Sequence, residues 1–135
     1  MSRALVDASA MVDLLVGTDQ GARVDSALRA HRVDELITVA HFDAEVFSAL
    51  ARLHRAAVLS ADDVADLLRR LGRSRVVRLP ISAELLASAW RLRENVAARD
   101  ALYVVAALSS RLPLLTTDER LVRAVDGLDV AVLTS

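Results

Sequence analysis

Four acidic residues occupy positions where a carboxylate usually binds something positive. Asp7 directly follows a short apolar run, and Asp118 follows a second one. Asp100 opens a helical segment, and Glu45 interrupts the apolar side of another. A carboxylate in such surroundings is costly unless a cation compensates it. If the four side chains converge, they form a site for a divalent cation.

Each acid also has an ordinary structural explanation when it is taken singly. Asp118 and Asp100 suit the first turn of a helix, where caps and the helix dipole favour an anion, and Asp7 suits a turn. Glu45 is harder to explain, because no arginine lies three or four residues away and only a protonated His41 could pair with it. One ordinary acid at this sheet edge would not be surprising, but four ordinary acids that all meet there by chance are less expected.

Short apolar runs alternate with amphipathic stretches along the chain. The expected strands are residues 4–7, 36–39, 75–79, 114–116 and 130–133, and the expected helices are residues 9–16, 21–31, 42–58, 61–71, 83–95, 99–110 and 119–125. This alternation predicts an α/β fold in which a parallel sheet of about five strands has helices on both faces. Ligands bind outside the carboxyl ends of such strands, which is where Asp7 and Asp118 lie.

The composition narrows the class of protein. The 135 residues carry a net charge of −1 and are expected to form one domain, residues 1–135. All 17 basic residues are arginine, which excludes phosphate-loop nucleotidases and Schiff-base enzymes because both need a lysine. The absence of cysteine excludes thiolate metal sites. No apolar run approaches the roughly 20 residues that span a bilayer, so a cytoplasmic protein with no membrane contact is expected.

The distribution of charge and aromatic residues says less about function. Seven arginines lie between residues 52 and 78 against three aspartates, which is typical of a solvated helical surface and, alternatively, of a strip that faces phosphates. Trp90 follows the helical spacing of Leu85, Leu86 and Ala89, so we expect it to pack in the core. The three histidines match no spacing for a metal site or an acid–base pair.

Four sequence motifs resemble one known family. They are residues 5–9 (Leu-Val-Asp-Ala-Ser), Glu45, residues 99–103 (Arg-Asp-Ala-Leu-Tyr) and residues 115–121 (Leu-Thr-Thr-Asp-Glu-Arg-Leu). In this order and at these separations, the chain resembles the PIN-domain ribonucleases, specifically the small VapC-type toxins of prokaryotic toxin–antitoxin pairs. The match covers essentially the whole chain, and it implies a PIN-like three-layer fold.

The resemblance implies that Asp7, Glu45, Asp100 and Asp118 hold Mg²⁺ or Mn²⁺ and carry out catalysis. The implied reaction is hydrolysis of RNA phosphodiester bonds that leaves a 5′-phosphate and a 3′-hydroxyl. A catalytically silent PIN-like module that binds protein or RNA is the alternative, and the intact acids argue against it. Receiver domains and haloacid-dehalogenase-like phosphatases are excluded, because they need a lysine.

Two further residues and two partners follow from the same resemblance, and a third residue, Arg99, follows from its position. Ser9 and Thr116 match hydroxyl positions that support the acids, although helix capping and strand-end packing are their ordinary explanations. Arg99 lies beside the expected site and is a candidate for contacting a substrate phosphate. The resemblance also implies a homodimer and a cognate VapB-type antitoxin.

Overall fold

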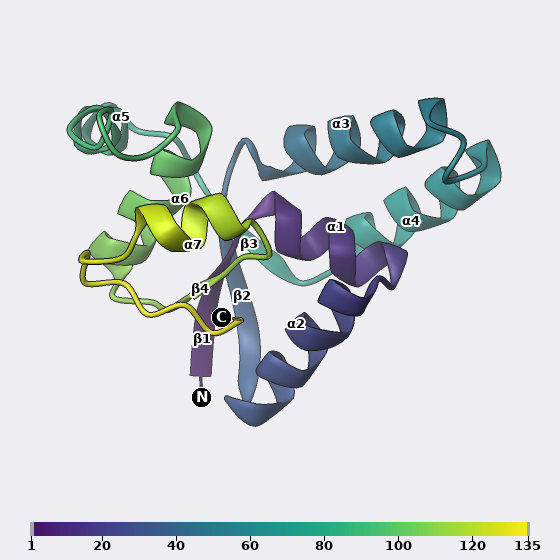
Figure 1. Cartoon of the computed structure of the whole chain (residues 1–135), viewed down its shortest axis with the longest axis horizontal. Coiled ribbons are helices and arrows are strands. Elements are labelled where there is room, and N and C mark those ends of the chain that lie inside the picture. Colours follow the sequence, from purple (N-terminus) through teal and green to yellow (C-terminus); the bar gives the residue numbers. More distant parts are fainter. Residues whose placement is uncertain (1, 135) are drawn as a thin grey trace.

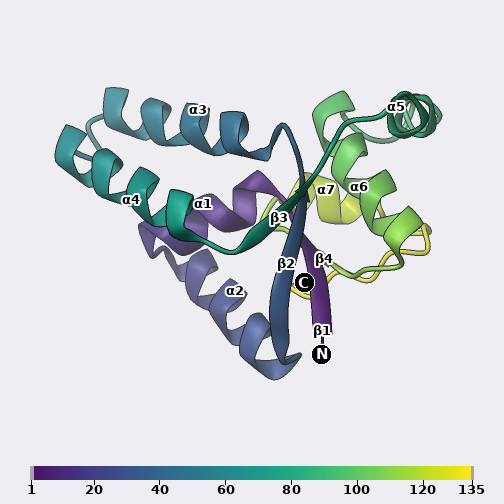
Figure 2. The ribbon, with the colours of Figure 1, turned by 180° about the vertical axis from the view of Figure 1, so that it is seen from behind.

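A parallel sheet lies at the centre of the computed structural model, which describes residues 2–134. Its strands are β1 (Ser2–Val6), β2 (Val33–Val39), β3 (Val76–Leu79) and β4 (Leu114–Leu115), arranged in the order β3-β2-β1-β4. The helices are α1 (Ala8–Val16), α2 (Asp19–Ala30), α3 (Phe42–Arg55), α4 (Ala61–Arg73), α5 (Ala83–Trp90), α6 (Ala98–Ser110) and α7 (Glu119–Ala124). Helices α1 to α4 lie on one side of the sheet and α5 to α7 on the other (Figure 1). The same division is seen from behind (Figure 2).

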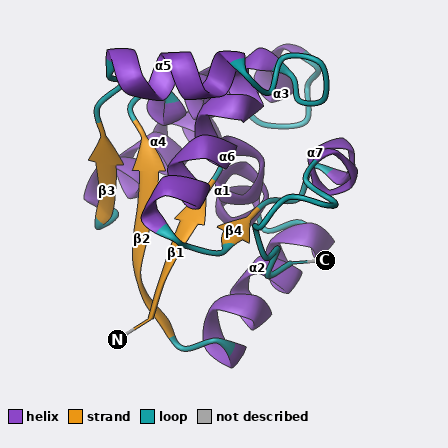
Figure 3. Cartoon of the chain, turned by 90° about the vertical axis from the view of Figure 1, so that its left-hand side faces the viewer, coloured by secondary structure: helices purple, strands orange, loops and turns teal. Residues whose placement is uncertain are grey.

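The strand order explains how the helices divide between the two faces. The connections from β1 to β2 and from β2 to β3 move outward in one direction, whereas the connection from β3 to β4 returns past β1. Because parallel crossovers are right-handed, reversing the direction moves the helices to the opposite face. The strands point toward one end of the sheet (Figure 3). The reversal at β1 leaves a crevice outside the carboxyl ends of β1 and β4.

Strand β1 and helix α3 supply much of the core that positions the acids. Residues 4–6 of β1 are fully buried, as expected for a central parallel strand covered on both faces. In register, Leu5 pairs with Ile37 of β2 and with Leu114 of β4. On α3, the side chains of Phe42, Val46 and Leu50 repeat every four residues and are fully buried. This fixes the rotation of α3 and places Glu45 at the edge of its buried face.

The predicted α/β fold with a parallel sheet is confirmed, but the fifth strand expected at residues 130–133 is wrong. Only Val132 forms an isolated parallel bridge there, with Leu114. Strand β4 stops after Leu115, because the backbone N–H of Thr116 donates to the Thr134 side chain at 3.3 Å instead of continuing a ladder.

The helix boundaries differ from the expected ones by three residues or more at two ends, and by one or two residues at several others. Helix α3 ends at Arg55, because the backbone at Ala57 has a φ of 61°, which a right-handed helix cannot accommodate. The segment expected as one helix over residues 83–95 is helical only to Trp90 and then forms turns. None of the helices in residues 2–134 has the length and apolar character needed to cross a membrane.

Candidate active site

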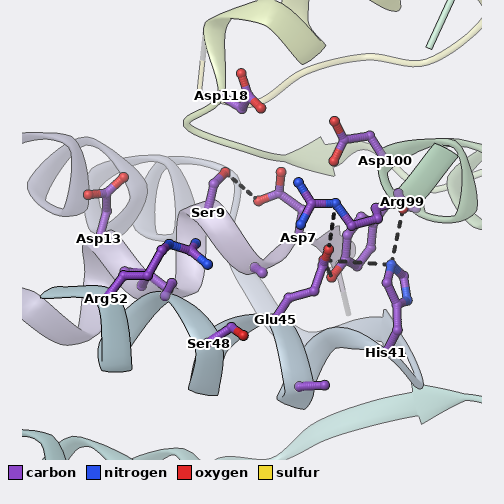
Figure 4. Close-up of a pocket in the computed structure, with 15 residues that line it drawn as sticks. Asp7, Ser9, Asp13, His41, Glu45, Ser48, Arg52, Arg99, Asp100 and Asp118 are labelled. Carbon is purple, nitrogen blue, oxygen red and sulfur yellow. Dashed lines mark hydrogen bonds and ion pairs between the residues drawn. The ribbon is translucent and has the colours of Figure 1, made fainter. Parts of the chain in front are cut away.

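The four acids predicted from the sequence line one cavity of about 580 Å³. Asp7 follows β1, Glu45 lies in the first turn of α3, Asp100 lies in the first turn of α6, and Asp118 precedes α7. Figure 4 shows Asp100 and Asp118 on the upper side of this cavity and Glu45 on the lower side, with Asp7 between them. Four segments far apart in the chain therefore bring their carboxylates to one place.

Asp7 is the most deeply placed of the four acids, with 2% of its surface exposed. Its Oδ1 accepts hydrogen bonds from the backbone N–H of Ala10 at 2.9 Å and from the Ser9 hydroxyl at 2.8 Å, so it caps α1. Its Oδ2 accepts a hydrogen bond from the Thr116 hydroxyl at 2.5 Å. Burial, with a smaller contribution from the negative charge of the nearby Asp100, raises the pKa of Asp7 to about 6 even though these bonds act to lower it.

The hydroxyls of Ser9 and Thr116 connect the loop after β4 to the start of α1. Thr116 Oγ1 accepts the backbone N–H of Asp118 at 3.1 Å while it donates to Asp7, and the Ser9 hydroxyl accepts the backbone N–H of Thr117 at 3.1 Å. The Thr117 hydroxyl donates to Oδ2 of Asp13, which lies one helical turn beyond Ser9, at 2.5 Å. These contacts fix Asp118 relative to Asp7, as expected for residues that orient metal ligands.

Glu45 is surrounded by three groups from other parts of the site. The Tyr103 hydroxyl donates to its Oε1 at 2.6 Å, and Arg99 Nε lies 3.6 Å from its Oε2. The His41 ring stacks on the Tyr103 ring at a centroid distance of 4.4 Å and contacts the Arg99 carbonyl oxygen at 3.0 Å. Burial, followed by the bond to Glu45, raises the pKa of Tyr103, so the phenol stays protonated and acts as a donor.

Asp100 and Asp118 complete the acidic side of the cavity. Asp118 caps α7, since its Oδ1 accepts the backbone N–H of Arg120 at 2.9 Å. The pKa of Asp100 is raised by burial, then by the negative charges of Asp118 and Glu45, and Arg99 only partly opposes this. Like charges in a partly buried site resist ionising together, so the protein alone leaves the negative charge of this cavity undercompensated.

The donor set fits a hard divalent cation. Carboxylate oxygens are the ligands that Mg²⁺ prefers, and it commonly takes one or two of them directly and keeps several waters. Within residues 2–134, no three His, Cys, Asp or Glu side chains are close enough to bind one ion directly as they lie. An ion held by one or two carboxylates, with the others acting through water, is consistent with that spacing. The raised pKa values of Asp7 and Asp100 indicate that the negative charge of these two carboxylates is the charge that a bound cation would compensate.

Sequence reasoning gave no role in the site to four residues that line the cavity, namely Asp13, His41, Arg52 and Tyr103, although it named His41 as the one possible partner of Glu45. Asp13 repeats the position of Ser9 one helical turn later, which is a usable signal. His41 and Tyr103 are 62 residues apart and meet only because α3 and α6 cross at the site. No local spacing could have indicated that contact.

Comparison with known proteins gives a consistent result. The family model for the PIN domain matches residues 4–127. Ribonuclease VapC3 of Mycobacterium tuberculosis is 48% identical over 121 residues, which are 89% of this chain and 85% of that protein. Ribonuclease VapC1 of the same organism is 38% identical over 92% of both chains. The crystal structure of Mycobacterium tuberculosis VapC20, a toxin that cleaves the sarcin-ricin loop, superposes with a TM-score of 0.67 at 16% identity, covering 91% of this chain and 95% of that one, and shows that the fold is shared.

The family match covers all four acids, and the two ribonucleases align with most of the chain at well over 30% identity. The chain therefore belongs to the PIN-domain family and, within it, to the VapC ribonucleases.

Proposed function

We propose that this chain is a cytoplasmic ribonuclease toxin that hydrolyses RNA phosphodiester bonds with the help of Mg²⁺ or Mn²⁺. The observation that carries the proposal is the convergence of Asp7, Glu45, Asp100 and Asp118 on one cavity. The positive groups of the protein do not fully offset the negative charge of these carboxylates, and Asp7 has a pKa raised to about 6. The relatives named as VapC ribonucleases support the choice of RNA as the substrate.

In the proposed reaction, water adds to phosphorus and the bond from phosphorus to the 3′ oxygen breaks, which leaves a 5′-phosphate and a 3′-hydroxyl. Asp7, Glu45, Asp100 and Asp118 would hold the ion, which supplies positive charge for the carboxylates and for the charge that develops on the phosphate. Ser9 and Thr116 hold Asp7 in one orientation. Arg99 has 78% of its side chain exposed at the cavity, and its guanidinium, whose Nε lies 3.6 Å from Glu45, would also contact a neighbouring phosphate.

Metal dependence gives the first test. Purified protein is expected to cleave single-stranded RNA in Mg²⁺ or Mn²⁺, to stop in EDTA and to recover when the metal is restored, and end mapping should find 5′-phosphates. Asp118→Asn is expected to abolish cleavage, because it removes one of the converging charges. Glu119→Gln is the matched control, since Glu119 is the next residue but is exposed and does not line the cavity. Cleavage that persists in EDTA contradicts the metal mechanism.

Tyr103 gives the second test, because its hydroxyl holds Glu45 from a different helix. Tyr103→Phe is expected to weaken Mn²⁺ binding about tenfold or more, as loss of a group that orients a metal ligand usually does. Isothermal titration calorimetry with Mn²⁺ measures this without relying on cleavage. Ser109→Ala, near the far end of α6, serves as the control. Equal Mn²⁺ affinity in Tyr103→Phe and the wild type would show that Glu45 needs no such support.

The proposal extends to the partners expected of a VapC toxin, a second copy of the chain and a VapB-type antitoxin that inhibits it. The VapC relatives are the observation in its favour. Co-expression with the neighbouring reading frame tests the antitoxin, and a stable complex that no longer cleaves RNA is the expected result. Recovery of the chain without a bound partner argues against this part of the proposal.

A further inference from the structure

A second cavity, of about 640 Å³, lies beside the acidic one, between α5 and the start of α6. Its walls are largely apolar and include Ala89, Val96 and Leu102. Arg99 lines both cavities, so the two are neighbours around the first turn of α6. We call this second cavity the Trp90 pocket, because the side chain of Trp90 forms part of its wall.

Trp90 is 68% exposed, against the expectation that it packs in the core. Helix α5 packs mainly on α6, so only Ala89 of this helix is buried and the indole is left at the surface. The Arg93 guanidinium lies over the Trp90 ring, 4.9 Å from its centroid, and donates to the Trp90 carbonyl oxygen at 3.0 Å. An exposed indole that carries a fixed cation is a surface suited to a flat, electron-rich ligand with a negative charge nearby.

We propose that the Trp90 pocket binds an unpaired base of the RNA strand next to the bond that is cleaved. This inference rests on the proposed ribonuclease function. Proteins that read single-stranded RNA stack its bases on aromatic rings and on arginine planes, and they hold its phosphates with arginine. The Trp90 pocket offers the ring, an apolar floor for the base, and Arg93 and Arg99 at its rim for phosphates. The shared Arg99 makes it continuous with the acids that would cut the strand.

Charge favours RNA over a second copy of the chain as the occupant. Among the charged residues of the pocket, two arginines outnumber the single acid, Glu94, which is itself exposed and lies 3.6 Å from Arg93. A symmetric contact through this surface would bring two surfaces of net positive charge against each other. A phosphate backbone instead complements them.

The chain has one tryptophan, so its intrinsic fluorescence reports on this pocket directly. The experiment uses the full chain carrying Asp7→Asn, which keeps the RNA intact, and a labelled single-stranded RNA of mixed sequence in Mg²⁺ buffer. Saturable quenching of Trp90 fluorescence that follows the anisotropy of the RNA is expected. In the same background, Trp90→Ala is expected to weaken RNA binding about tenfold or more, and Trp90→Phe to retain most of it.

Phe47→Ala is the matched control, because Phe47 is also an exposed aromatic residue, at 58%, but lines neither cavity. RNA binding without a change in Trp90 fluorescence, or with equal affinity in Trp90→Ala, overturns the inference. Sedimentation that shows a dimer becoming a monomer in Trp90→Ala also overturns it, since the pocket is then a contact between copies.

The chain without the Asp7→Asn change distinguishes an error in the pocket proposal from an error in the proposed ribonuclease function. If RNA is cleaved with metal but Trp90→Ala leaves KM for RNA unchanged, the pocket is wrong and the ribonuclease function stands. If RNA quenches Trp90 fluorescence but is not cleaved with metal, the chain binds RNA at this pocket and the proposed function is wrong. The expected result is a raised KM with little change in kcat.

Discussion

Replacing Asp7 with asparagine is expected to abolish RNA cleavage and, at the same time, to stabilise the protein near neutral pH. Asp7 is 2% exposed, and burial is the main cause of a pKa raised from an ordinary 3.8 to about 6. A change of this size corresponds to about 3 kcal/mol of folding free energy that the ionised carboxylate costs. Asparagine removes this cost and still offers an oxygen to the backbone N–H of Ala10.

The pH dependence of stability separates this explanation from others. A buried acid with a raised pKa binds its proton more tightly in the folded state, so its contribution makes the wild type more stable as the pH falls from about 7 to about 4. The asparagine variant lacks this contribution, and its advantage should be large at pH 7.5 and small at pH 4.5. Urea unfolding in EDTA at the two pH values measures it, with Asp34→Asn, at an exposed position on β2, as the control. A variant that still cleaves RNA, or that is less stable than the wild type at pH 7.5, contradicts the role given to Asp7.

Thr116→Val is expected to lower the free energy of unfolding by about 1.5–3 kcal/mol and to reduce cleavage strongly. The single hydroxyl of Thr116 donates to buried Asp7 and accepts the backbone N–H of Asp118, so valine keeps the shape and leaves both groups without this partner. This hydrogen bond lowers the pKa of Asp7, and its loss should therefore raise that pKa further.

Because the lost bond favours the ionised form of Asp7, the destabilisation of Thr116→Val should be greater at pH 7.5 than at pH 4.5. Urea unfolding of the two proteins at both pH values gives this comparison. Thr116→Ser restores the hydroxyl and is expected to recover most of the stability and cleavage. A valine variant as stable as the wild type at pH 7.5 would mean that the hydroxyl makes no net contribution.

Local rules were sufficient to predict that Asp7 and Asp118 lie together, whereas the shared site of all four acids was predicted from the family resemblance. Asp7 and Asp118 follow apolar runs that become adjacent parallel strands, and the carboxyl ends of such strands open on one crevice. Glu45 could be placed on the apolar side of its helix because it lies in one row with Phe42 and Ala49. These inferences use spacing over a few residues and one general property of parallel sheets.

The sequence indicated one neighbour of Glu45, His41, whose Nε2 lies 3.6 Å from Oε1 of Glu45, but its other contacts could not be predicted in this way. Its partners Tyr103 and Arg99 lie more than 50 residues away, and they meet it only through the angle at which α6 crosses α3. Trp90 was misjudged for a related reason, since periodicity identifies the apolar stripe of a helix but does not indicate whether another element covers it. Strand 130–133 was wrong because its neighbour β4 is only two residues long.

The segment after α7 influences where the protein can be extended for laboratory work. The Thr134 hydroxyl donates to the carbonyl oxygen of Thr116, and the backbone N–H of Leu133 donates to Leu114 at 3.0 Å. An affinity tag fused at this end of the chain would follow closely on Thr134, which holds the loop that carries Thr116 and Asp118. Strand β1 begins at Ser2, and Asp7 follows its other end, so a tag ahead of β1 would be separated from the acids by the length of the strand. The amino terminus is therefore the safer point of attachment for activity assays.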